Sequence, residues 1–358
     1  MVLVCKDLTY DNNSLAKKKL MSVNFDNETS LPSIISREMD ESSMNQYRSE
    51  TNGFGITYTE TLNFEIHIMK QFDEFTSQNE LEFTPEEYDD LVSWLSSPQT
   101  HKWLDITTEN NIDTKVKGYF SSIEPYENWG ICYGARCTFN CNSPYSYIEK
   151  THEDSVTGVK NFILNNESSE LYDYVYPNIL IEPTKNEEIF IHNLSDSEII
   201  DNGNISQSED SGVVAQLQDK ISSYASTHNL TVEYVIDDDT KDVKIICSGN
   251  GLLFYMIDSY GISNKYVAYY LQSDSQYYIC KGGFFYCNLL QALNITLDCK
   301  NLSMYDSLER PVLFTEIGIQ DEDEIYWPRL IHGNNSIRIY GNFNINIDYL
   351  EPRKGLLI

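Results

Sequence analysis

The stretch Glu82–Leu104, with the sequence EFTPEEYDDLVSWLSSPQTHKWL, decides how the first half of the chain is interpreted. It begins with the signals of a helix start. Thr84 can cap the helix with its hydroxyl, Pro85 suits the first position because no N–H is needed there, and Glu87 completes a capping box. Pro98 then ends the helix, and the residues that follow indicate the start of a strand.

Four apolar residues of this helix recur at helical spacing and form one stripe: Tyr88, Leu91, Val92 and Leu95. The segments on both sides alternate like strands, so we expect a single helix in the first half, packed across one face of a sheet. Trp94 lies beside the stripe, at the edge of the core or at a subunit contact. Such a helix is ordinary in an α+β domain and names no function by itself.

The strands around the helix define a first domain of residues 1–150. Thr61–Met69 alternates apolar and polar residues, which predicts that His67 lies on the solvated face of its strand and argues against a catalytic role for it. Further strands are expected after the helix, around Trp103, at Val116–Ile123 and at Gly130–Cys141.

Two polar stretches interrupt the strand pattern. Glu38–Thr51 has almost no periodicity and predicts a long loop, which is uncommon inside a compact domain unless the loop binds something. Glu149–Asn166 is mostly polar and predicts a linker, set at residues 151–170, between the first domain and the second.

The second domain is predicted over residues 171–358. Its strands are expected at Tyr174–Glu182, Glu188–Asn193 and Pro311–Ile317. Near the end, two alternating runs, Ser336–Tyr340 and Phe343–Tyr349, lie on either side of Gly341-Asn342. That pair suits the turn of a tight hairpin, so the sequence predicts one there.

An insertion in the second domain is predicted over residues 210–275. Gly212–Leu230 carries a helical apolar stripe, and Thr231–Ile236 with Val243–Cys247 predicts a hairpin across an acidic turn. Three successive aspartates, residues 237–239, could bind calcium there. The run lacks the spaced ligands and the glycine of an EF-hand loop, which favours a solvated turn.

The charge of the chain limits its partners. It has 25 Lys plus Arg against 55 Asp plus Glu, a formal net charge of -30. That balance argues against binding nucleic acid through its phosphates, because such binding needs clustered basic residues. The one basic run, Lys17–Lys19, is interpreted as protection of a solvent edge.

No apolar run approaches the roughly 20 residues that span a bilayer, and the apolar start is too short for a signal peptide, so we expect synthesis in a cytoplasm and no membrane insertion.

The sequence offers no catalytic or metal-binding motif. Its eight cysteines show no CxxC spacing, which favours small core residues over zinc ligands or disulfides. The six histidines have no pair at metal-binding spacing, and a nucleophile elbow, a phosphate-binding glycine loop and a dinucleotide fingerprint are all missing. We therefore predict a protein that is not an enzyme and that needs no cofactor.

Four features, in this order, resemble the distal tail protein of tailed bacteriophages, which joins the tail tube to the host-adhesion apparatus. LNFEIHI (62–68) precedes the helix TPEEYDDLVSWLSS (84–97), and YFSSIEPYENWGICYGARCTFNCNSPY (119–145) closes the first domain. YVYPNILIEPTKNEEIFIHNLSD (174–196) opens the second domain, and WPRLIHGNNSIRIYGNFNINIDYLEPRK (327–354) lies at the end of the chain. The resemblance rests on order and pattern and includes no catalytic fingerprint.

The resemblance implies a mainly β (α+β) protein of two domains. The first would be a β-sandwich or barrel like the tail tube, with one packed helix, forming a ring, usually hexameric, whose lumen passes DNA. The second would be a galectin-like β-sandwich with an inserted helix-plus-strands subdomain. The implied partners are other copies of the chain, the tail tube protein and the tail hub or tail-associated protein, with tape measure or receptor-binding proteins as further candidates. The implied location is the virion, at the tail tip or baseplate, after synthesis in the host bacterium.

The 210–275 segment departs from the pattern of the family, in which some relatives carry inserted carbohydrate-binding modules. Five of its tyrosines could stack on sugar rings: Tyr255, Tyr260, Tyr266, Tyr269 and Tyr270. Packing between strands is the simpler interpretation of the same residues. A carbohydrate-binding host-recognition module acting through the second domain is therefore the alternative function. A cell-wall-degrading tail enzyme would need a carboxylate or zinc site that the sequence does not display.

Overall fold

The chain, in a computed structural model, divides into two compact units. The first comprises residues 1–150, 168–170 and 350–358, and the second comprises residues 151–167 and 171–349. The structure describes residues 2–26, 37–41, 53–73, 76–108, 110, 112–201, 204–206, 231–236, 242–248, 253–258, 265–271, 276–281, 283–291, 293–318 and 326–354.

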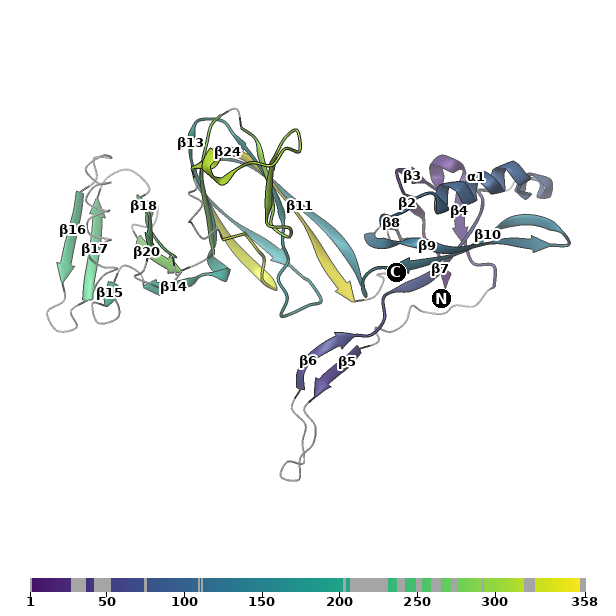
Figure 1. The fold of residues 1–358 in the computed structure, drawn as a ribbon, viewed down its shortest axis with the longest axis horizontal. Coiled ribbons are helices and arrows are strands. Elements are labelled where there is room, and N and C mark those ends of the chain that lie inside the picture. The colour runs from purple at the N-terminus through teal and green to yellow at the C-terminus, as the bar shows by residue number, and fades with distance from the viewer. Residues whose placement is uncertain are drawn as a thin grey trace, which may run out of the picture. The chain divides into compact units, whose positions relative to one another are not determined.

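The predicted helix is α1, Pro85–Ser96 (Figure 1). Its capping box is complete. The Thr84 hydroxyl accepts a hydrogen bond from the Glu87 amide at 3.2 Å, and the Glu87 carboxylate accepts one from the Thr84 amide at 2.8 Å. Pro85 has no N–H, so the capping motif satisfies two of the three N–H groups that lack an intrahelical partner at this terminus, those of Thr84 and Glu87.

The buried face of α1 differs slightly from the predicted stripe. Leu91 and Leu95 are buried, and the third buried residue is Trp94. The Trp94 indole N–H donates to the carbonyl of Tyr10 at 2.9 Å, as a buried indole requires. Trp94 therefore lies at the edge of the core, one of the two positions that the sequence allowed.

The sheet under α1 is built around β7, the predicted alternating strand. β7 pairs antiparallel with β4 and β10 and parallel with β1. β10 pairs with β9, β9 with β8, and β8 with β2. The elements of this unit are β1 (Val2–Leu3), β2 (Asp7–Tyr10), β3 (Asn13–Ser14), η1 (Ala16–Lys18), β4 (Leu20–Val23), β5 (Arg37–Glu41), β6 (Gly53–Tyr58), β7 (Asn63–Lys70), η2 (Gln78–Leu81), α1, β8 (Lys102–Thr107), β9 (Asp113–Asn128) and β10 (Ile131–Cys141).

The core of the first unit follows the alternation of its strands. Its fully buried centre consists of Phe64, Ile66 and Ile68 from β7 with Ala135, Cys137 and Phe139 from β10. Phe139 makes edge contacts with the rings of Tyr10 and Phe120, at 6.1 Å and 5.0 Å between ring centres. Cys137 and Cys141 of β10 are core residues, as the sequence predicted.

The stretch predicted as a long loop at residues 38–51 is partly a strand. Residues 38–41 belong to β5, which pairs antiparallel with β6. The alternation is hidden because a two-stranded ribbon has no sheet face to bury, so polar residues can occupy both of its sides. Residues 42–51 lie outside the described part of the chain.

Most of the predicted linker, residues 151–166, belongs to a strand. β11 (Tyr145–Asn166) begins in the first unit, where Tyr147 pairs with Lys115 of β9, and continues into the second unit. There Val156 and Leu164 are buried in the core. A strand with only one face in a core has polar residues on the other, which is why the segment looked like a linker.

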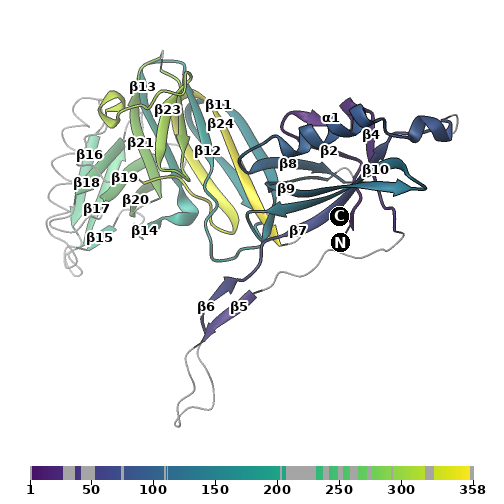
Figure 2. The same ribbon diagram turned by 45° about the vertical axis from the view of Figure 1, so that its right-hand side comes forward.

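The second unit continues with β12 (Asn178–Pro183), β13 (Glu187–Asn193), η3 (Leu194–Asp196), β21 (Phe284–Leu289), β22 (Ile295–Asp298), β23 (Ser303–Asp306), η4 (Phe314–Ile317) and β24 (Gly333–Lys354). β24, β12, β22 and β23 pair in that order, and β13 pairs with both β24 and β21. Both views of the ribbon show β24 running alongside β11 (Figures 1 and 2).

The hairpin predicted around Gly341-Asn342 does not form. The residues on both sides belong to the single strand β24, which pairs with β13 through Ile337–Tyr340 and with β12 through Phe343–Asp348. β12 and β13 thus lie end to end along one side of β24. A Gly-Asn pair only permits a turn, and here two successive partner strands hold the backbone extended through it.

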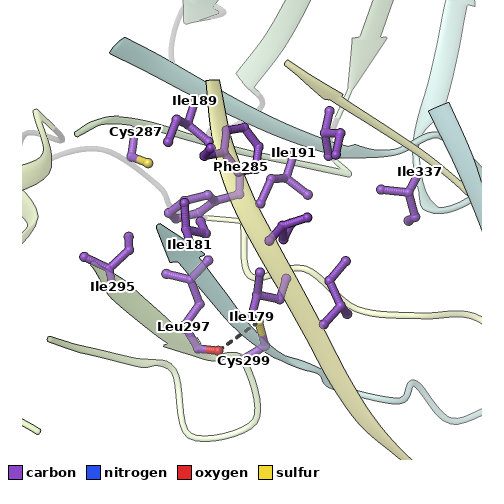
Figure 3. Close-up of a cluster of buried hydrophobic side chains, with 14 of the residues drawn as sticks. Ile179, Ile181, Ile189, Ile191, Phe285, Cys287, Ile295, Leu297, Cys299 and Ile337 are labelled. Carbon is purple, nitrogen blue, oxygen red and sulfur yellow. Dashed lines mark hydrogen bonds between the residues drawn. The ribbon is translucent and has the colours of Figure 1, made fainter. Parts of the chain in front are cut away.

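The core of the second unit lies between these strands (Figure 3). Its labelled centre consists of Ile179, Ile181, Ile189, Ile191, Phe285, Cys287, Ile295, Leu297, Cys299 and Ile337. The strand predicted at Pro311–Ile317 is replaced by a single bridge at Pro311 and the 3-10 helix η4. A proline cannot donate to a sheet ladder, and Gly318 ends η4 in the left-handed region, so the apolar run buries Ile317 without forming a strand.

Two small sheets lie in and around the segment predicted as an insertion. One consists of β14 (Glu198–Asp201), β20 (Gln276–Lys281), β19 (Lys265–Leu271) and β18 (Leu253–Asp258), and the other of β15 (Asn204–Ser206), β17 (Asp242–Ser248) and β16 (Thr231–Ile236). The predicted β16–β17 hairpin is confirmed. The sheets include residues on both sides of the predicted 210–275 range. The predicted helix at 212–230 and the aspartates at 237–239 lie outside the described residues.

The predicted fold class, mainly β with one packed helix, is confirmed, and α1 is the single α-helix of the described ranges. Among the helices described, none has the length and apolar character that crossing a bilayer requires.

Candidate assembly surfaces of the first unit

The hairpin of β9 and β10 ends in a two-residue turn formed by Trp129 and Gly130. Asn128 and Ile131 are the last paired residues, and both turn residues have positive φ angles, 54° and 78°. These angles are typical of a type I′ turn, which favours Asn or Asp followed by Gly. A bulky side chain in the left-handed region costs roughly 1 kcal/mol or more. Trp129 therefore stands where the fold itself favours a small polar residue.

The tip of this hairpin is also exposed and acidic. Trp129 is 96% exposed, and Glu124 and Glu127 are exposed beside it. Residues 122–133 include no Lys or Arg. β7 pairs with β10 only from Gly134 onward, so β9 and β10 run on to the turn as a two-stranded ribbon (Figures 1 and 2). We call residues 124–131 the tip.

A second distinct surface of the unit is the basic run Lys17–Lys19, at η1 and the residue after it. All three side chains are exposed, and no carboxylate of the described residues forms an ion pair with any of them. The Lys18 ammonium lies 5.2 Å from the centre of the Trp94 ring. Three neighbouring lysines without an ion pair to any described carboxylate are unusual in a chain with an excess of 30 acidic charges.

The outer face of the sheet is covered by a short segment after β4, residues 24–26, which we call the strap. The Phe25 ring stacks between His67 and Tyr126, at 4.9 Å and 3.9 Å between ring centres. The Phe25 amide donates a hydrogen bond to Nδ1 of His67 at 3.1 Å. Asp26, the last residue of the strap, accepts a hydrogen bond from the Arg136 guanidinium at 2.5 Å, and this bond holds the C-terminal end of the strap in place.

The prediction that His67 is solvated is therefore wrong. His67 is fully buried, because Phe25 covers the face of β7 that the alternation leaves outward. Burial lowers the pKa of His67, and the neighbouring Arg136 charge lowers it further, while Asp26 and Glu65 oppose the shift. The hydrogen bond from Phe25 also needs an unprotonated Nδ1, so the strap holds the imidazole neutral.

A half-buried carboxylate anchors the β5–β6 hairpin to the rest of the first unit. Glu170 accepts hydrogen bonds from the hydroxyls of Tyr58 and Tyr145 at 2.5 Å and 2.8 Å, and its carboxylate lies 2.9 Å from the Lys354 ammonium. Burial alone would raise the pKa of Glu170, but the hydrogen bonds from Tyr58, Lys354 and Tyr145 outweigh it and lower that pKa. Tyr58 is the last residue of β6, so this cluster fixes the base of the hairpin.

The tyrosines that could stack on sugar rings belong to the predicted insertion. Tyr255 is in β18, and Tyr266, Tyr269 and Tyr270 are in β19, which pairs with β18. The register places Tyr266 opposite Ile257 and Tyr270 opposite Leu253. Tyr260 lies outside the described residues. Sugar binding by these tyrosines therefore stays a prediction.

The buried cysteine thiols are unreactive. Burial raises the pKa of Cys137 and of Cys141 to about 12, so both thiols stay protonated near neutral pH. Among the described residues, no group of three or more His, Cys, Asp and Glu side chains is arranged to hold a metal ion.

Sequence reasoning missed the tip and the strap. Asn-Trp-Gly between two alternating runs was the available signal for the tip, because Gly in such a pair often takes a positive φ. The strap could not be predicted from a local sequence pattern, because Phe25 covers a residue, His67, that lies 42 positions further along the sequence.

Comparison with known proteins gives a match for the first unit. Residues 3–143 match a protein family described as "Phage tail protein N-terminal domain". No curated protein matches the chain significantly.

Solved structures of phage hub and baseplate proteins resemble the chain over nearly its whole length. The Dit protein of phage SPP1, described as "a paradigm of hub adsorption apparatus in Gram-positive infecting phages", is 10% identical, with 97% of this chain and 98% of that chain covered and a TM-score of 0.47. A chain of the phage P2 baseplate in its activated conformation with calcium is 10% identical, with the same coverage and a TM-score of 0.38. A chain of the phage p2 baseplate with strontium is 9% identical, with 96% of each chain covered and a TM-score of 0.37.

The first unit is thus similar to phage tail protein N-terminal domains over residues 3–143, in agreement with the resemblance to phage tail proteins found in the sequence. The matched range contains α1, β7, β9 and β10, so the helix, the tip and the basic run all lie on the matched domain. A phage tail protein is a component of the virion, in agreement with the predicted location.

Proposed function

We propose that the chain is a distal tail protein that forms a hexameric ring between the tail tube and the tail-tip hub. The observation that carries this proposal is the match of residues 3–143 to phage tail protein N-terminal domains. The order of segments in the sequence, which continues into the second unit, supports the same family. The role is mechanical and needs neither a catalytic site nor a cofactor.

The acidity of the chain fits a ring through which DNA passes. With a net charge of -30, its surface repels phosphates and disfavours adhesion of the genome. We propose that acidic residues line the lumen. A ring structure with basic or neutral lumen walls would contradict this part of the proposal.

The adaptor role is tested by binding to the two proposed neighbours. Purified full-length protein should bind the tail tube protein and the tail hub protein of the same phage separately, and both at once in a ternary complex. Size-exclusion chromatography with mass detection would measure this. Competition between the tube and hub proteins, or binding to neither, would contradict an adaptor with two opposite faces.

The alternative is host recognition through glycans bound by the second domain. It rests on the tyrosine-rich strands β18 and β19 of the insertion. A glycan array probed with the full-length chain and with a Tyr266→Ala/Tyr270→Ala variant would test it. Binding that the variant loses would support the alternative, and no binding would leave the insertion with a structural role.

A further inference from the structure

We propose that the tip of the β9–β10 hairpin, with Trp129 at its turn, docks on the basic run Lys17–Lys19 of a second copy of this chain. This contact rests on the proposed ring and names two surfaces that would close it. The indole would lie against the lysine side chains, and the acidic residues of the tip would pair with their ammonium groups.

The side chain of Trp129 is almost fully exposed, and its backbone conformation is strained. Its indole is 96% exposed, and its backbone has a φ of 54°, where Asn, Asp or Gly would be less strained. Backbone strain of this kind persists where it serves a function, and tryptophan is one of the residue types enriched among the residues that anchor protein interfaces. The turn therefore presents Trp129 outward to a partner.

The charges near Trp129 indicate what the partner offers. Glu124 and Glu127 are exposed, and no cation of the described residues forms an ion pair with either. A partner surface should therefore be basic. In a chain with 25 basic and 55 acidic residues, few surfaces qualify.

Lys17–Lys19 is the complementary surface. It is the single run of three basic residues in the sequence, and its side chains are exposed and without ion pairs to described carboxylates. Lys18 already lies over one indole, that of Trp94, at 5.2 Å. Ammonium groups attract the face of an aromatic ring, and more strongly when both are desolvated, as they would be in an interface.

Two different surfaces on one chain make a head-to-tail contact. Repeated from copy to copy, such a contact closes into a ring when the rotation allows it, whereas a contact between identical surfaces stops at a dimer. The tip and the basic run are separate parts of the matched domain, as a ring built by this domain requires.

Trp129→Asn separates assembly from folding. Asn followed by Gly relaxes the type I′ turn, so the variant should unfold at a temperature equal to or about 2 °C above that of the wild type when both are dilute and dissociated. The same substitution should raise the concentration needed for half-assembly about tenfold or more, because it removes an interface anchor. Mass photometry across a dilution series would measure assembly. Tyr172→Asn, at a tyrosine of the second unit that is 94% exposed, is the matched control and should assemble like the wild type.

Charge reversal tests the pairing of the two surfaces. Glu127→Lys and Lys18→Glu should each weaken assembly, and the double variant should recover most of it, because the pair is restored with its signs exchanged. Lys300→Glu, at an exposed lysine of the second unit, controls for the change in net charge.

Three outcomes are distinct. Loss of assembly in Trp129→Asn without loss of stability, with rescue by the double charge reversal, would establish the contact. A wild-type ring that survives all these variants would overturn the contact and leave the proposed function standing. A wild-type chain that stays monomeric at every concentration would overturn both the contact and the ring.

Discussion

The two faces of the first unit's sheet are covered in different ways. The inner face is covered by α1, twelve residues with a capping box and three buried side chains. The outer face is covered around His67 by one aromatic ring, that of Phe25, from a three-residue strap. Both covers bury part of β7, but only the first is visible in local sequence patterns.

The difference shows what periodicity can and cannot reveal. A helix can be predicted from the spacing of its apolar residues and from its capping residues, because its structure depends on residues three and four apart. The strap is held by contacts with residues far away in sequence: Phe25 with His67 and Tyr126, and Asp26 with Arg136. A polar residue at an outward strand position can therefore be fully buried without any sign in its own segment.

Disrupting the packing of α1 on the sheet should have the largest effect on the stability of the first unit. Leu91 is 2% exposed, so Leu91→Asp would remove its packing and bury an unpaired charge. We expect a loss of at least about 4 kcal/mol of unfolding free energy in the first unit, enough to unfold it. Circular dichroism during urea titration would measure the loss.

The control for Leu91→Asp is Ser93→Asp, on the exposed side of the same helix. It should change the unfolding free energy by no more than about 0.5 kcal/mol. A folded Leu91→Asp protein with the stability of this control would contradict the packing of α1.

Removing the aromatic ring of the strap should destabilise the first unit less. Phe25 is half-buried, so Phe25→Ala should cost about 1–2 kcal/mol, mostly from lost stacking on His67 and Tyr126. The same variant should raise the pKa of His67 toward its ordinary value of 6.5, because water reaches the imidazole. NMR titration of the imidazole would measure the pKa.

Phe72→Ala is the matched control, because Phe72 is 51% exposed and lies in the same unit outside the strap. The account of the strap fails if Phe25→Ala leaves both the stability and the pKa of His67 as they are in Phe72→Ala.

The smallest expected effect is the pH dependence that His67 confers. Its pKa is lowered in the folded chain, so unfolding takes up a proton below the ordinary pKa of 6.5. The stabilisation is complete above 6.5 and declines as the pH falls below that value. We expect the unfolding temperature to drop between about pH 7 and about pH 5.

His192, in the second unit, also has a lowered pKa, about 3, because it is buried, and it contributes with the same sign. The His67 part is the difference between the wild type and His67→Gln, which should show a flatter pH profile. Identical profiles would mean that the strap does not hold the imidazole neutral.

The sequence predicted the elements that depend on local rules. α1, its capping box, β7, the buried cysteines of β10 and the β16–β17 hairpin all follow from spacing within one segment. The errors arose where a partner strand decides the outcome. Gly341-Asn342 could turn, but β12 and β13 hold β24 extended, and polar residues 151–166 form a strand because β11 buries only one face.

The candidate assembly surfaces were less predictable. Lys17–Lys19 stands out in the sequence, but only the three-dimensional structure shows that no described carboxylate forms an ion pair with these lysines. Trp129 is a significant residue only once the turn is known, because the strain comes from its positive φ and the exposure from its place at the end of the ribbon.

The mass of the purified full-length protein in solution, with negative-stain images of the same sample, tests the central claim most directly. The account predicts a particle of about six times the 41.4 kDa mass of one chain, seen as a closed hexameric ring with a central opening. A uniform 41.4 kDa monomer at all concentrations, with no rings in the images, would contradict it.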